Sequence, residues 1–216
     1  MGSDSKSPHR QKRKVIKHML QCTGLVLVAA FVILNVLAYN HARAMTRFSR
    51  GGTRTDRPES LDYAREHSHH PRLILFGQSM EAVSILRAAH EHGIKPDAVI
   101  VEAVFDSMLN TTRNRFKAMR VPSFPNAELL VFWGGRQWGF NGFAHNPAEF
   151  AKSLDRPVLF MHGTHDPRAT LAEARRVFDA VSAPKSFVSF DAVGHEAYIS
   201  ARPRLWKRAV YGVLKP

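Results

Sequence analysis

The sequence contains one cysteine, no internal repeat and fewer acidic than basic residues. Because Cys22 has no second cysteine to pair with, an internal disulfide is excluded, and cysteine usage does not identify the compartment. The histidine-rich stretch EHSHH, at residues 66–70, is not accompanied by a further ligand cluster at the spacing of a metal site, which favours a solvated turn. We therefore expect neither a metal nor another cofactor.

The shortage of acidic residues gives a formal net charge of +13, from 31 Lys and Arg against 18 Asp and Glu. This excess is concentrated at the N-terminus, where residues 1–60 hold 11 basic and three acidic side chains around one apolar segment. A basic segment beside an apolar one is typical of contact with anionic lipid headgroups. We therefore expect a membrane, and no nucleic acid, as the partner of this region.

The apolar segment, residues 19–38, contains no charged side chain and matches the roughly 20 residues that cross a bilayer. The positive-inside rule places the basic N-terminus in the cytoplasm. We predict a disordered basic tail at residues 1–18, a single transmembrane helix or signal anchor at 19–40, and a juxtamembrane linker at 41–60. Two alternatives remain open: secretion after signal cleavage, because Ala42, Arg43 and Ala44 form a small-x-small site, and a buried helix of a soluble protein.

Residues 61–216 alternate between short apolar runs and stretches of helical periodicity. This alternation predicts an α/β domain with a parallel sheet of about four strands flanked by helices. The predicted strands are residues 72–76, 98–105, 156–163 and 185–190, and the predicted helices are residues 79–92, 171–181 and 203–214.

A long insertion, residues 106–154, interrupts the alternation between the second and third strands. Connections of this length usually contain their own helices and often act as a lid over a site. We call this insertion the cap. Its aromatic side chains either line an apolar pocket or pack the cap on the sheet, and the residues concerned are Trp133, Trp138, Phe140 and Phe143.

Three residues capable of nucleophilic catalysis follow predicted strands: Ser79 after the first, Asp166 after the third and His195 after the fourth. Reactive groups of open α/β sheets gather at the carboxyl ends of the strands. Each residue alone has a simpler interpretation, because serine and aspartate commonly cap helices and a histidine is common in surface loops. Their coincidence at three strand ends favours a triad.

In that triad Ser79 is the nucleophile, His195 the base and Asp166 the acid that orients the base. The N–H of Met80 is the candidate oxyanion donor. Asp106, after the second strand, is the alternative acid.

The phrases LFGQSMEA, HGTHDPR and GHEAY resemble the nucleophile elbow, acid loop and histidine loop of α/β hydrolases, which occur in the same order Ser, Asp, His. The phrases VFDSMLNTTRNRF, FWGGRQWGFNGFAHNP and LNVLAYNHARAMTRFS resemble segments of membrane-anchored bacterial serine hydrolases related to dienelactone hydrolases and acylglycerol lipases. The resemblance implies a partial α/β-hydrolase fold with a helical cap, and an ester or acyl substrate.

The sequence departs from that pattern in two places. Glu81 replaces the last glycine of G-x-S-x-G, where we expect crowding, and the strands and second oxyanion loop that precede the elbow have no counterpart. Residues 72–76 would then form an unprotected edge strand prone to self-association. We therefore expect weak ester hydrolysis or none, and a non-catalytic membrane-tethered remnant or interaction protein is the second hypothesis.

Overall fold

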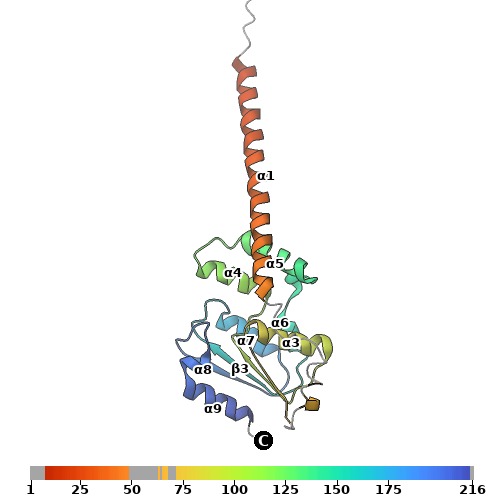
Figure 1. Cartoon of the computed structure of the whole chain (residues 1–216). Helices are drawn as coiled ribbons and strands as arrows, with labels where there is room; N and C mark the ends of the chain where they lie inside the picture. The colour runs from red at the N-terminus through yellow and green to blue at the C-terminus, as the bar shows by residue number, and fades with distance from the viewer. Residues whose placement is uncertain (1–7, 49–62, 64, 68–71, 215–216) are drawn as a thin grey trace, which may run out of the picture.

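The computed structural model describes residues 8–48, 63, 65–67 and 72–214, which form an α/β domain carrying a long N-terminal helix (Figure 1). The start of the predicted basic tail, most of the predicted linker and the histidines at positions 69 and 70 lie outside the described residues.

The N-terminal helix α1 (Pro8–Phe48) continues without interruption over 41 residues. The sequence predicted a helix over residues 19–40 only, with disorder before it and a linker after it, so the structure extends the helix in both directions. Lys, Arg and Gln, which are frequent just after Pro8, are good helix formers, and proline suits the first helical position. Extending an existing helix adds one hydrogen bond per ordered residue, which is easier than nucleating a new one.

The domain contains a parallel sheet in the order β1-β2-β3-β4, which confirms the predicted α/β domain with about four parallel strands. The strands are β1 (Ile74–Gln78), β2 (Ala98–Glu102), β3 (Val158–Gly163) and β4 (Lys185–Phe190). β1 ends two residues later than predicted, because Gly77 and Gln78 still pair with Val101 and Glu102 of β2.

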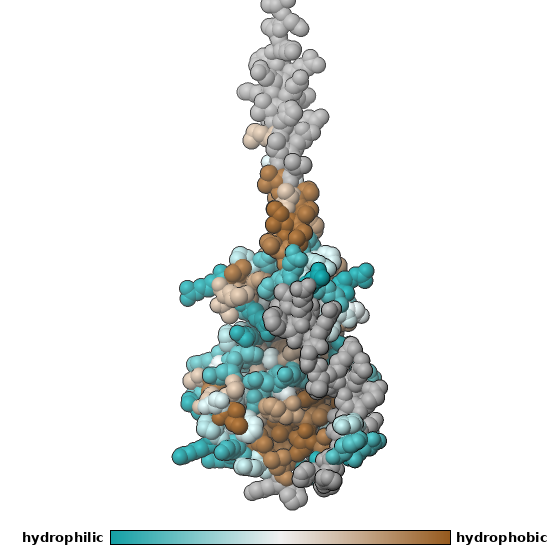
Figure 2. Space-filling model, in the orientation of Figure 1, coloured by the Kyte–Doolittle hydropathy of each residue, from teal (hydrophilic) through white to brown (hydrophobic). Residues whose placement is uncertain are grey.

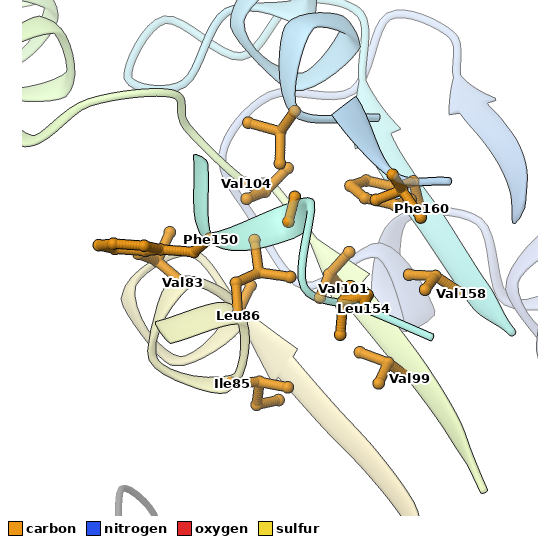
Figure 3. Close-up of a cluster of buried hydrophobic side chains, with 14 of the residues drawn as sticks. Val83, Ile85, Leu86, Val99, Val101, Val104, Phe150, Leu154, Val158 and Phe160 are labelled. Carbon is orange, nitrogen blue, oxygen red and sulfur yellow. The ribbon is translucent and has the colours of Figure 1, made fainter. Parts of the chain in front are cut away.

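Helices cover both faces of this sheet. Side chains alternate between the faces of a strand, so Val99 and Val101 point to one side and Ile100 to the other. The first side packs against α3 (Met80–His92), α6 (Pro147–Ala151) and α7 (Leu171–Ala180) (Figure 3). The second packs against α8 (Tyr198–Ala201) and α9 (Pro203–Leu214), which gives a three-layer domain.

The cap has its own helices, as predicted: α4 (Met108–Ala118), α5 (Asn126–Trp138), the 3₁₀ helix η2 (Gly142–Ala144) and α6. α6 belongs to the core through Phe150, whereas α4 and α5 lie at the end of the domain where α1 meets it (Figures 1 and 3).

The cap aromatics do not share one environment, and neither predicted role describes all of them. Trp133 contacts α1: its Nε1 donates to Asn35 Oδ1 at 3.2 Å, and its ring packs edge-on against Tyr39. Phe140 lies beside Arg87 and His145. Trp138 and Phe143, in contrast, are about half exposed.

β1 pairs with β2 only and therefore forms an edge of the described sheet. Phe76 is 52% exposed, and Ile74 and Leu75 are partly exposed. Figure 2 shows apolar surface over the part of the sheet left open between α3 and α9.

Candidate active site

Ser79 occupies a sharp turn between β1 and α3. Its φ of 56° and ψ of −113° lie in a region that L-residues rarely adopt, at a cost of about 1–3 kcal/mol. Its N–H donates to Glu102 O at 2.8 Å, which ties the turn to β2. The side chain makes no capping hydrogen bond to α3, so capping does not account for this serine.

Gly77 permits this turn because the first turn of α3 lies directly on the end of β1. A Cβ at Gly77 would be 2.7 Å from Ala82 N and from the carbonyl carbon of Glu81. Glu81 itself is exposed, so the crowding expected at this position does not occur in the described structure. A carboxylate in the first turn also interacts favourably with the helix dipole.

Asp166, in the loop after β3, forms a hydrogen bond with His195, in the loop after β4. His195 Nδ1 lies 2.7 Å from Asp166 Oδ2, and the two side chains are 13% and 0% exposed. The other carboxylate oxygen, Oδ1, accepts from the N–H groups of Arg168 at 2.8 Å and Ala169 at 3.0 Å. The carboxylate is therefore fixed by its own loop and directed at the imidazole.

The electrostatics of this pair determine which imidazole nitrogen carries the proton. Burial acts to raise the pKa of Asp166, but the hydrogen bonds from His195 and from the Ala169 and Arg168 N–H groups outweigh it, so the pKa is lowered. An ionised carboxylate only accepts hydrogen bonds, so Nδ1 of a neutral His195 is the donor. Nε2 is then left with a lone pair that can accept a proton.

The loop carrying His195 crosses the sheet from β4 towards β1. At the end of β3, a Cβ on Gly163 would lie 2.7 Å from Gly194 O, so the crossing requires glycine there. The Gly163 N–H donates to the buried Tyr198 hydroxyl at 2.8 Å, which anchors the far end of the loop. At β1, Gln78 Nε2 donates to Glu196 O at 2.8 Å. This last bond joins the residue before Ser79 to the residue after His195.

Asp106, the alternative acid, has different partners. Its Oδ2 accepts from Arg176 at 2.7 Å and 2.8 Å, and its Oδ1 accepts from Asn110 at 3.1 Å. Both oxygens are thus bound within the α4–α7 region, whereas the imidazole of His195 is bound by Asp166. Met80, the candidate oxyanion donor, is the first residue of α3, where an N–H has no acceptor within the helix.

Sequence reasoning missed Gln78, Gly163 and Tyr198 as residues that position the loops. A glycine that ends a buried strand, as in HGTHD, is a signal for close approach of another segment. The Gln78 contact has no such signal, because its partner lies 118 residues away in the sequence.

Among the residues that the structure describes, no three His, Cys, Asp or Glu side chains gather as a metal site would require.

No protein-family model matches the chain. An uncharacterized protein of Bacillus subtilis, YqkD, is 26% identical over 163 residues, which cover 70% of this chain and 52% of that protein. An esterase of Pyrococcus furiosus superposes with a TM-score of 0.55 at 16% identity, over 72% of this chain and 58% of the esterase. An acylaminoacyl peptidase of Pyrococcus horikoshii superposes with a TM-score of 0.51 at 18% identity, over 72% of this chain and 25% of the peptidase.

The chain thus spans little more than half the length of YqkD and of the Pyrococcus furiosus esterase. At these identities the likeness to the solved structures is one of fold: a parallel sheet with helices on both faces.

Proposed function

We propose that this chain is a serine hydrolase of the α/β-hydrolase type that acts on carboxyl esters or short acyl substrates and is held at a membrane by α1. The observation that carries the proposal is the hydrogen bond between His195 Nδ1 and the buried Asp166 carboxylate, on a loop tied through Gln78 to the elbow of Ser79. The fold shared with an esterase and a peptidase supports it.

In the proposed reaction, Ser79 Oγ attacks the substrate carbonyl carbon while His195 Nε2 takes the hydroxyl proton. Asp166 keeps the imidazole in the required tautomer and stabilises the imidazolium that forms. Collapse of the tetrahedral intermediate expels the alcohol, which receives the proton from His195. Water then attacks the acyl-enzyme by the same proton transfers and releases the acid and Ser79.

The N–H of Met80 is the proposed donor to the developing oxyanion. In acyl-transfer enzymes, removing one oxyanion donor lowers kcat by about 10²–10³-fold. Because the sequence offers no counterpart of the loop that donates the second N–H in the family it resembles, we expect slow turnover, with Ser79 still reactive towards an activated phosphonate.

Two features favour membrane anchorage. Among the described residues, one helix is long and apolar enough to cross a bilayer: α1, in which only 6% of the residues in Val26–Arg43 are buried. A cleaved signal sequence has the same features, but cleavage after Ala44 would remove Asn35 and Tyr39, which bind the cap. This docking favours a retained helix. We propose a cytoplasmic N-terminus on the basis of the basic residues that precede the apolar segment.

The test is covalent labelling of the full chain with a fluorophosphonate, together with p-nitrophenyl acetate turnover. Ser79→Ala should abolish both signals. Ser84→Ala is the matched control, because this serine lies in the next turn of α3 and its hydroxyl bonds only to Met80 O among the described partners. Absence of labelling in the unchanged chain, or equal labelling after Ser79→Ala, would overturn the proposal.

The same assay distinguishes the two candidate acids. Asp166→Asn should reduce turnover by about 10⁴-fold, because the imidazole would then hold the wrong tautomer. Asp106→Asn should change turnover only slightly, since this carboxylate pairs with Arg176.

One observation favours a second candidate, a non-catalytic interaction protein. The edge of β1 is open and carries Phe76 at 52% exposure, and open strand edges pair readily with other chains. Absence of phosphonate labelling in a chain that still self-associates would support this alternative.

A further inference from the structure

We infer that the cap is itself a membrane-docking surface, lying on the headgroup region of the bilayer that α1 crosses. This inference rests on the proposed anchorage by α1, and it concerns a part of the chain that lies outside the candidate triad.

The first argument is the position of the α1–α5 contact along α1. Asn35 binds Trp133, and the Tyr39 carbonyl accepts from Gln137 Nε2 at 3.1 Å. Asn35 lies three residues, about 4.5 Å along the helix axis, inside the end of the apolar segment at residue 38. If residues 19–38 fill the hydrocarbon core, α5 therefore lies at its boundary.

The second argument is the character of the cap surface beside α1. The segment that joins α4 to α5 lies at the top of the globular part, next to α1, and brown surface is visible there (Figures 1 and 2). Its side chains are unusually exposed for apolar residues: Phe124 is 75% exposed and Met119 is 61% exposed. Further exposed apolar side chains of the cap are Val121, Phe132, Trp138 and Phe143.

The third argument is charge. The cap contains six basic and three acidic side chains, and each acidic one is paired: Glu128 with Arg113, Glu149 with Lys152 and Asp106 with Arg176 of α7. Lys117, Arg120 and Arg136 are exposed on the cap as well. Surfaces that combine apolar side chains with exposed cations bind anionic bilayers. Their apolar side chains enter about 5–10 Å into the boundary between headgroups and acyl chains. A protein partner would not require the match in position with the end of the α1 apolar segment, so we assign the surface to lipid.

The test uses the full chain with Cys22→Ser and one introduced cysteine carrying an environment-sensitive fluorophore, reconstituted into vesicles of phosphatidylcholine and phosphatidylglycerol. Nitroxide-labelled lipids then quench fluorophores that contact the bilayer. The cap position is Phe124→Cys, with Met119→Cys as a second cap position if the first variant does not fold. Val28→Cys reports on α1, and Tyr211→Cys, an exposed site on α9 away from α1, is the matched negative control (Figure 1).

We expect loss of emission at positions 28 and 124 and none at 211. Replacing Lys117 and Arg120 by alanine should lower the ratio of docked to undocked cap about fivefold for each residue. Quenching at position 28 without quenching at position 124 would overturn the inference that the cap docks on the membrane, while the proposed anchorage by α1 would stand. No quenching at 28 would show that the anchorage has failed, and with it this inference, whereas phosphonate labelling of Ser79 tests the hydrolase separately.

Discussion

His145 gives the cap a built-in sensitivity to acid. The residue is 7% exposed, and its ring packs against Phe140 and Phe150. Burial lowers its pKa to about 4, with repulsion from Arg87 adding to the shift and attraction to Glu91 opposing it. The imidazole is therefore neutral in the folded chain at pH 7.

The sign of the effect follows from proton linkage. The folded pKa of about 4 lies below the value of 6.5 for an exposed histidine, so between these two values the unfolded chain binds more protons than the folded one. The free energy of unfolding therefore falls as the pH decreases through this window. The full loss is on the order of 3 kcal/mol, of which about 2 kcal/mol is lost between about pH 7 and pH 5. This is a large part of the roughly 5–15 kcal/mol that stabilises a typical domain.

The variant His145→Leu removes this contribution. Its stability at neutral pH should change little, because His145 Nε2 is buried without a hydrogen-bond partner among the described residues. Urea unfolding in detergent, followed by tryptophan fluorescence between about pH 7 and pH 5, should show a stability loss about 2 kcal/mol smaller than in the unchanged chain. His92→Leu, at the exposed end of α3, is the control and should retain the full pH dependence. An unaltered pH dependence in His145→Leu would refute the linkage argument.

Two further predictions concern β1. Gly77→Ala should lower the free energy of unfolding by about 1–3 kcal/mol and reduce phosphonate labelling, because the new Cβ would lie 2.7 Å from backbone atoms. Gly134→Ala is the control, because a Cβ at this position would meet nothing within 4 Å. Equal effects of the two alanines would contradict the close approach of α3 to β1. Phe76→Lys should weaken self-association of the detergent-solubilised chain in sedimentation velocity, since a charge on an open strand edge opposes pairing. A chain that is monomeric before the change would rule out association through β1.

The strands could be predicted because each contains apolar residues in a short run with a local signal. β2 and β3 are buried at every residue and mostly apolar, as is typical of buried strands in parallel sheets, whereas β4 combines apolar and polar residues. α7 begins with a capping box between Thr170 and Glu173, a purely local arrangement. The order of Ser79, Asp166 and His195 at strand ends is also local information, because Ser79 directly follows β1 and the other two lie within five residues of the ends of β3 and β4.

Contacts between distant segments could not be predicted in this way. The environment of Trp133 depends on α1, 98 residues earlier in the chain, and the fixation of Gln78 depends on Glu196. The extent of α1 was underestimated because this helix was predicted from its apolar segment alone, and its basic ends lie outside that segment. Glu81 was expected to crowd the elbow because the pattern G-x-S-x-G has glycine at this position, whereas Glu81 is exposed in the described structure.

The Asp166–His195 pair and Ser79 are held in place by different parts of the structure. Asp166 and His195 belong to the loops after β3 and β4, and Tyr198 anchors them at Gly163, so their hydrogen bond does not depend on what pairs with β1. Ser79 lies in the turn after the edge strand β1, and the described contacts of this turn come from β2, α3 and the loop that carries His195. A chain that covers the open side of β1 would restrict motion of the serine without touching the imidazole. We therefore expect any such partner to alter the reactivity of Ser79 while leaving the Asp166–His195 pair intact.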